Sequence, residues 1–304
     1  MGSRLPHPAG GARRRPPLNF TDFIAIDWSG QAVERPRGLA VAHASAGTAA
    51  PELVDRNWSR QDILDYLLGL ADRGTRALIG LDLGPALPFA DRHSYFPGWS
   101  DSPSDARALW ALVDRLCADD PHLGVSTFVD HPEASRHFRR HGGRKGDRFG
   151  EGGGRLRVTE HAQREQELNP YSNLNLVGAA QVGKSSLSGM RVLHRLDGRI
   201  PIWPFDPVPA EGPVLVEIYT ALAARLAGMR KGTSKIRDAQ TLDMLLAVFE
   251  SEAHAPLARY DDHATDAMLS AAWLRVAADR PESWSPGGLT PELARTEGWT
   301  FGIR

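Results

Sequence analysis

Two short apolar runs, each ending in an aspartate, constrain the fold more than any other feature of this chain. Residues 23–27 read FIAID and lead into Trp-Ser-Gly, and residues 77–82 read ALIGLD and lead into Leu-Gly-Pro. A short apolar run that ends in turn-forming residues is typical of a buried strand. The sequence therefore predicts two buried strands that place Asp27 and Asp82 at their ends.

The residues between these runs predict the order of the first secondary-structure elements along the chain. Residues 37–44 and 51–58 read as two further strands, and residues 60–72 place apolar side chains at helical spacing before Gly74, where a helix stop belongs. We expect the order strand, strand, strand, helix, strand.

The remainder of the chain predicts one large domain with a long insertion. We expect residues 1–18 to be a disordered tail, residues 19–280 to form the domain, and residues 281–304 to be a Pro/Gly-rich surface tail. The insertion, 85–212, contains a basic, glycine-rich loop over 139–157. Further elements are expected as helices over 104–118, 220–227, 238–250 and 262–278, and as strands over 123–129 and 213–219.

Composition excludes several classes of protein. The 304 residues include 36 basic and 37 acidic side chains, which argues against a globally basic nucleic-acid binder but not against local patches. The single cysteine, Cys117, excludes an intramolecular disulfide framework and predicts no disulfide-linked partner. We find no membrane-spanning apolar run and no secretory signal, so we expect a soluble cytoplasmic protein with no membrane partner.

Acidic side chains at the ends of predicted elements are the strongest indication of chemistry. A single such acid is usually a helix cap or an ion-pair partner. Several on separate buried elements repel one another unless a cation joins them, and oxygen-rich sites suit Mg²⁺ or Mn²⁺. The candidates are Asp27, Asp82, Glu217 in the strand VLVEIY, and Asp262, His263 and Asp266 at the start of a helix.

Taken in order, these motifs resemble DUF429, an uncharacterised family of predicted ribonuclease H-like nucleases. The resemblance rests on IDWSG, GLDLGPALP, GAAQVGKSSLSGM with the following IPIWPFD, LVEIY and DHATDA, and it covers roughly residues 20–280. It implies an α/β ribonuclease H-like fold with a mixed sheet flanked by helices. It also implies metal-dependent hydrolysis of phosphodiester bonds in nucleic acid, DNA or RNA.

The resemblance also implies roles for individual residues of the site. Asp27 is expected to bridge two metal ions, and Asp82 and Asp266 to hold one each. Glu217 matches the glutamate of the family's VEVYP motif, although the expected proline is Thr220 here. Glu217 and His263 are further candidates as metal ligand or proton carrier, and Asp262 as a further ligand.

Local clusters of basic residues independently favour a nucleic-acid partner. Residues 135–157 contain eight Lys or Arg and two acids, and residues 225–237 contain five Lys or Arg and no acid. Such patches can replace phosphate counterions, although a solvated polar loop would look the same. The candidate nucleic-acid contacts are Arg144, Lys145, Arg148, Lys184, Lys231 and Lys235.

Residues 178–185 read GAAQVGKS, which matches the pattern of a nucleotide phosphate loop. Such a loop needs a buried strand before it and a helix after it. The preceding residues are weakly strand-like, and Gly189 lowers helix propensity downstream, so we interpret the segment as a structural turn. A nucleotide-dependent phosphotransferase and a non-catalytic ribonuclease H-like binding domain remain the alternatives.

Overall fold

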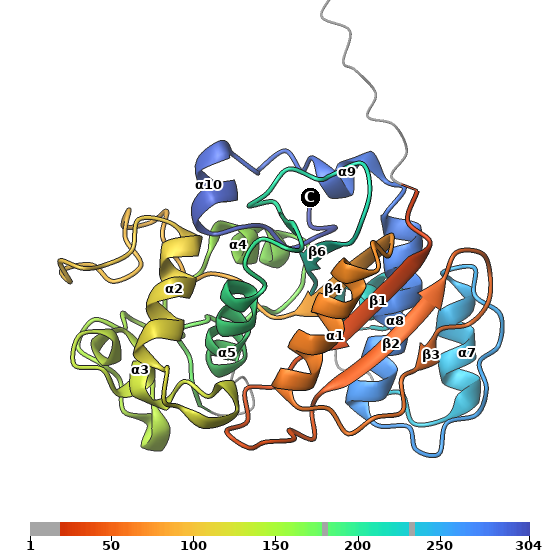
Figure 1. Ribbon diagram of the computed structural model, residues 1–304, viewed down its shortest axis with the longest axis horizontal. Helices are drawn as coiled ribbons and strands as arrows, with labels where there is room; N and C mark the ends of the chain where they lie inside the picture. Colours follow the sequence, from red (N-terminus) through yellow and green to blue (C-terminus); the bar gives the residue numbers. More distant parts are fainter. Residues whose placement is uncertain (1–18, 178–181, 231–234) are drawn as a thin grey trace, which may run out of the picture.

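The computed structural model describes residues 19–177, 182–230 and 235–304, and its centre is a six-stranded mixed sheet (Figure 1). The strand order is β3-β2-β1-β4-β6-β5. The first three strands, β1 (Asp22–Asp27), β2 (Ala40–Ser45) and β3 (Glu52–Leu53), are antiparallel neighbours. The other three, β4 (Ala77–Asp82), β5 (Ile202–Trp203) and β6 (Val214–Glu217), run parallel to β1.

Helices cover both faces of this sheet. On one face, α1 (Arg60–Asp72) and α5 (Val182–Arg195) pack on a core that includes Ile26 and Leu81. On the other face, α8 (Asp262–Ala277) packs on β1 and β2 in a second core (Figure 1). The two cores arise because successive strand side chains point to opposite faces. The prediction of a mixed sheet flanked by helices is confirmed.

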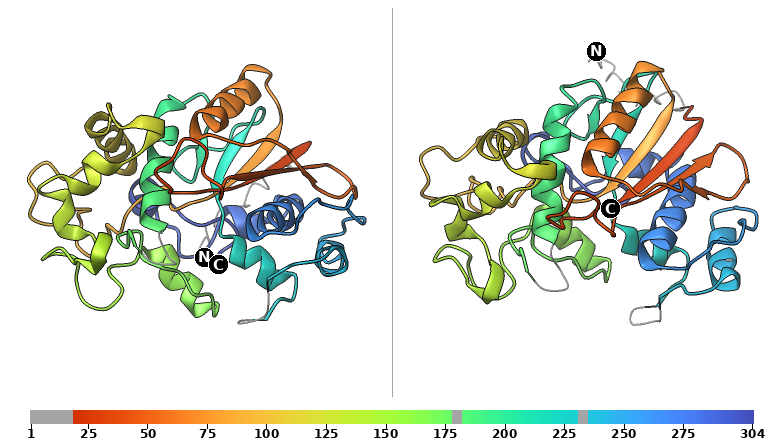
Figure 2. Two further views of the ribbon diagram at one scale, coloured as in Figure 1. Left: turned by 90° about the horizontal axis from the view of Figure 1, so that it is seen from below. Right: turned by 60° about the horizontal axis from the view of Figure 1, so that its bottom comes forward.

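The segment between β4 and β6 forms the lobe drawn in yellow and green at one side of the sheet (Figure 2). Its helices are α2 (Ala106–Leu116), α3 (Ser126–Asp130), α4 (Val158–Glu165) and α5, with short 3₁₀ turns at Pro121–Leu123, Ala134–His137 and His141–Gly143. The remaining helices are α6 (Thr220–Leu226), α7 (Ala239–Ala247), α9 (Pro281–Trp284) and α10 (Pro291–Thr296).

Three local predictions are wrong. Residues 126–130 form α3 and not a strand, because the Asp120 carboxylate accepts hydrogen bonds from Thr127 N and Oγ1 at 2.9 and 2.7 Å. The third strand is only two residues long. Gly189 does not break α5; a Cβ there would lie 2.3 Å from Leu83 Cδ2, so the glycine permits close approach of the helix to the end of β4.

One predicted segment also needs correction. Residues 281–304 are not a surface tail, because Trp284, Trp299, Phe301 and Ile303 are buried in the second core. The predicted insertion, 85–212, contributes strand β5 to the sheet and helix α5 to the core on one of its faces. The predicted tail 1–18 lies outside the described residues.

Among the residues that the structure describes, no helix combines the length and apolar character needed to cross a membrane. Cys117 is buried and unpaired with any other cysteine.

Candidate active site

Asp27 and Asp82 lie side by side at the carboxyl ends of two central parallel strands. They are register partners between β1 and β4. Because side chains alternate along a strand, both carboxyl groups point to the face covered by α8, opposite Ile26 and Leu81. The sequence placed each acid at a strand end, and the parallel pairing brings the two together.

Helix α8 brings His263 and Asp266 to the same edge of the sheet. Its amino end is fixed by Asp261, whose side chain accepts a hydrogen bond from Ala264 N. His263 Nδ1 lies 2.7 Å from Asp27 Oδ2. The Asp27 side chain is 9% exposed and the imidazole 47% exposed, so a buried acid orients a ring that solvent reaches.

The electrostatics show that three acids on three elements share one environment. Burial raises the pKa of Asp82 well above its usual range, and the charges of Asp27 and Asp266 raise it further. Burial raises the pKa of Asp27 even though its hydrogen bond from His263 opposes this. Burial, followed by repulsion from Asp27, raises the pKa of Asp266 to about 7. These carboxyl groups are therefore close enough to oppose one another's ionisation.

Thr220 hydrogen-bonds Asp82 at the position where the family pattern expects proline. The backbone N–H and the hydroxyl of Thr220 donate to the carboxylate at 3.4 and 3.3 Å. Proline could provide neither donor. No Lys, Arg or His forms an ion pair with Asp82 among the residues that the structure describes.

Asp262 is turned towards cations and not towards the other acids. Its carboxylate lies 2.7 Å from Lys235 Nζ and 2.5 Å from Arg237 Nη1. Although partial burial opposes this, the two cations lower its pKa. Asp262 therefore has cationic partners that Asp266 lacks, although its charge still contributes to the raised pKa of Asp266, one helical turn away.

Glu217 points to the opposite face of the sheet. It is the register partner of Leu81, whose side chain belongs to the core beneath α1 and α5. Arg157, which is 1% exposed, donates to both Glu217 oxygens at 2.6 and 2.9 Å, and Thr300 Oγ1 donates at 2.8 Å. Glu217 is thus neutralised by a buried ion pair and is not brought together with Asp27 and Asp266.

The sequence analysis did not identify Arg157 as the partner of Glu217. A carboxylate in a buried strand requires a compensating cation, so Glu217 signals that such a partner exists. Nothing in the local sequence says which of the many arginines supplies it, because the two residues are 60 positions apart.

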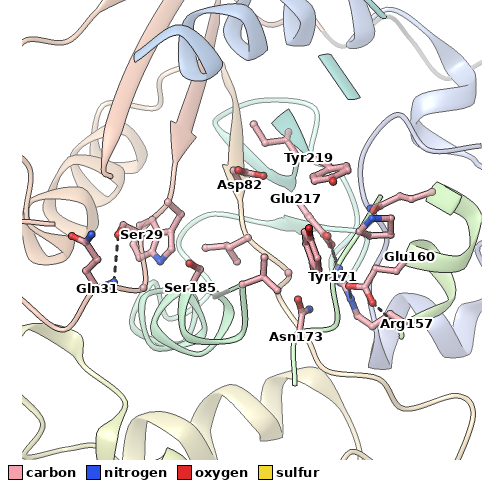
Figure 3. A pocket seen from close by; sticks show the side chains of 18 residues that line it. Ser29, Gln31, Asp82, Arg157, Glu160, Tyr171, Asn173, Ser185, Glu217 and Tyr219 are labelled. Carbon is pink, nitrogen blue, oxygen red and sulfur yellow. Dashed lines mark hydrogen bonds and ion pairs between the residues drawn. The ribbon is translucent and has the colours of Figure 1, made fainter. Parts of the chain in front are cut away.

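Cavities border the acids on two sides. The first, of about 440 Å³, has Asp82, Glu217 and Tyr171 in its wall, and Ser185 of α5 approaches it from the side of Ser29 and Gln31 (Figure 3). The second, of about 350 Å³, is lined by Asp266 and Lys235. Tyr219 lines both.

The predicted metal ligands lie near one another and have suitable chemistry, but their side chains are not arranged around a single metal position. Asp27, Asp82 and Asp266 offer the oxygen donors that Mg²⁺ and Mn²⁺ prefer, and burial is the main cause of their raised pKa values, with repulsion from neighbouring acids adding to it for Asp82 and Asp266. Within the described residues, no three His, Cys, Asp or Glu side chains are positioned to hold one metal ion together. Asp27 is instead hydrogen-bonded to His263, and Asp82 to Thr220.

The predicted nucleic-acid contacts fall in different places. Lys184 and Arg144 line one further cavity, and Lys235 lies beside Asp262. Lys145 packs over Phe149, and Arg148 donates to the carbonyl of Pro97. Lys231 lies outside the described residues, as do residues 178–181 of the phosphate-loop pattern.

The second half of the phosphate-loop pattern lies at the start of α5. Gly183, Lys184 and Ser185 lie in the first turn of α5, so a helix does follow the pattern. No strand precedes it within residues 173–177, where Asn175 forms only an isolated bridge with Arg139. The segment therefore lacks the strand that a nucleotide phosphate loop requires.

No family model, curated protein or solved structure matches the chain.

Proposed function

We propose that this protein is a metal-dependent nuclease with a ribonuclease H-like fold, related to the DUF429 family. The observation that carries the proposal is that β1, β4 and α8 bring three buried acids, Asp27, Asp82 and Asp266, to one edge of the sheet. There the charges of Asp27 and Asp266 raise the pKa of Asp82, and the charge of Asp27 raises the pKa of Asp266. The sheet supports it, because three antiparallel strands followed by parallel ones have the order expected from the resemblance.

In this proposal Asp27, Asp82 and Asp266 hold Mg²⁺ or Mn²⁺. A pair of such ions activates water and stabilises the leaving oxygen of a phosphodiester. Burial raises the pKa of all three carboxyl groups in the metal-free protein, and repulsion between acids adds to this for Asp82 and Asp266, so metal binding favours release of protons from the site.

His263 is the proposed proton carrier. Its Nδ1 faces Asp27 Oδ2, which fixes the ring and leaves Nε2 to exchange a proton with substrate or solvent. The hydrogen bond to Asp27 raises the pKa of His263 and favours its charged form. A half-exposed imidazole that is oriented by a buried carboxylate suits general acid and base catalysis.

The test is cleavage of single- and double-stranded DNA and RNA in the presence of Mn²⁺ or Mg²⁺. We expect the wild type to degrade at least one substrate, EDTA to abolish cleavage, and Asp82→Asn to reduce it at least ~100-fold. Asp262→Asn is the matched control, because it removes the same charge from a neighbouring acid that is paired with Lys235 and Arg237.

Failure of every substrate with both metals would favour a non-catalytic binding domain. Release of ADP from ATP that is lost when Asp27 or Asp82 is replaced would instead favour the phosphotransferase. Equal loss of cleavage in Asp82→Asn and Asp262→Asn would contradict the assignment of the site.

A further inference from the structure

A small cationic cavity lies behind the turn that follows Asp27. It has a volume of about 170 Å³ and is lined by Gly30, by Arg60 at the start of α1, by Arg140 and Arg144, and by Lys184 of α5. Gly30 also lines the larger cavity beside Asp82. The turn after β1 therefore separates this basic cavity from the candidate active site.

Close contact between this turn and α5 fixes the position of the basic cavity relative to the candidate active site. A Cβ on Gly30 would lie 2.5 Å from Ser185 N and 2.7 Å from Lys184 Cβ, so only glycine fits there. Trp28 adds a hydrogen bond from Nε1 to Ser188 Oγ of the same helix at 3.1 Å. Lys184 is thereby fixed relative to Asp27.

Arg60 is the decisive residue, because it is a buried cation without an acidic partner. The side chain is 1% exposed, and its guanidinium donates only to the backbone carbonyls of Ser29, Gln31 and His122. No carboxylate forms an ion pair with it among the described residues, and the sequence outside them contains no Asp or Glu. A buried uncompensated charge is costly, so it is a feature that a bound anion would relieve.

The other cations of the cavity are also positioned for an anion. The backbone N–H of Arg140 donates to the carbonyl oxygen of Arg144 at 2.8 Å. The two residues flank a tight turn in which Gly142 and Gly143 have φ of 72° and 74°. Among the described side chains, Arg140 Nε is buried without a hydrogen-bond partner and Lys184 forms no ion pair. Asp130, the one acid in the wall, is paired with Arg140 at 2.9 Å.

We propose that this cavity binds a backbone phosphate of a polynucleotide and so anchors the strand beside the acids. This inference rests on the proposed function, because it assigns the phosphate to a nucleic-acid substrate. A tetrahedral phosphate oxyanion matches four guanidinium or ammonium groups around a small cavity. Arg60 supplies a fixed positive charge, Arg140 supplies an Nε–H without a partner, and Arg144 and Lys184 complete the basic lining.

The experiment measures binding of a fluorescein-labelled single-stranded oligonucleotide by anisotropy in EDTA, where no cleavage occurs. The double variant Lys184→Ala/Arg144→Ala should weaken binding about tenfold or more and make the slope of log Kd against log [salt] shallower by about one to two. The matched control is Arg73→Ala, which removes a charge from an exposed residue at the far end of α1. It should change Kd less than about twofold.

Binding of inorganic phosphate, measured by calorimetry, distinguishes the source of the anion. If the double variant loses phosphate binding but binds the oligonucleotide like the wild type, the cavity serves a free phosphate and the proposal is overturned. Equal oligonucleotide affinity in the wild type and the double variant, or no binding by the wild type at low salt, overturns it as well. Because the assay needs no metal, weaker binding in the double variant together with an inactive wild type would support the phosphate site and reject the nuclease.

Discussion

The acid cluster predicts that removing one charge stabilises the metal-free protein, and Asp266→Asn tests this. The substitution keeps the size of the side chain and eliminates its ionisation. Burial and the charge of Asp27 raise the pKa of Asp266 from 3.8 to about 7, a shift of about three units. At about 1.4 kcal/mol per unit, ionised Asp266 costs the folded state at most about 4 kcal/mol.

The sign of the pH dependence follows from linkage. The folded protein holds the Asp266 proton between the unfolded pKa, near 4, and the folded pKa of about 7, whereas the unfolded chain releases it. The free energy of unfolding of the wild type therefore falls relative to Asp266→Asn as the pH rises through this window. We expect Asp266→Asn to gain less than about 1 kcal/mol at pH 4 and about 3 kcal/mol at pH 8.

Urea unfolding in EDTA at pH 4, 6 and 8 measures the effect. The change with pH is the informative quantity, because any lost hydrogen bond shifts all three values equally. Asp262→Asn is the control in the same helix: the ion pairs with Lys235 and Arg237 lower the pKa of Asp262, so its removal should destabilise at pH 8 by less than about 1 kcal/mol. If the Asp266→Asn difference does not grow between pH 4 and 8, the acids do not share the environment described.

Three further results are expected. Excess Mn²⁺ in a thermal melt should raise the Tm of the wild type by several degrees and that of Asp82→Asn by less than half as much, since a ligand is missing; equal shifts would reject the proposed ligands. Arg157→Met should reduce the free energy of unfolding by about 3–5 kcal/mol in urea at pH 8, because Glu217 and Glu160 lose their buried cation, and an unchanged midpoint would contradict this. Gly30→Ala should cost about 1–3 kcal/mol by the same assay, because its Cβ overlaps the α5 backbone; wild-type stability would show that the two segments are not in close contact.

The strand-ending aspartates and the α8 amino end could be predicted because local patterns specify them. Apolar runs bury β1 and β4 in the sheet whatever surrounds them, and the acid that ends each run must then lie at its edge. The first turn of α8 depends on Asp261 and its neighbours alone. Local patterns do not determine α3, whose first turn is hydrogen-bonded by Asp120 from outside the helix.

Contacts between distant segments decided which acids lie together and which are paired elsewhere. Asp27 meets His263 across 236 residues, and Arg157 meets Glu217 across 60. Whether Glu217 faces the α8 side or the α5 side depends on the register of β6 against β4, because a shift of one residue would move its side chain to the other face. The sequence by itself determined which acids sit at strand and helix ends. Only the tertiary structure decided that Asp27, Asp82 and Asp266 share one environment while Glu217 is neutralised on the opposite face, since strand register and buried ion pairs are set by contacts between distant segments.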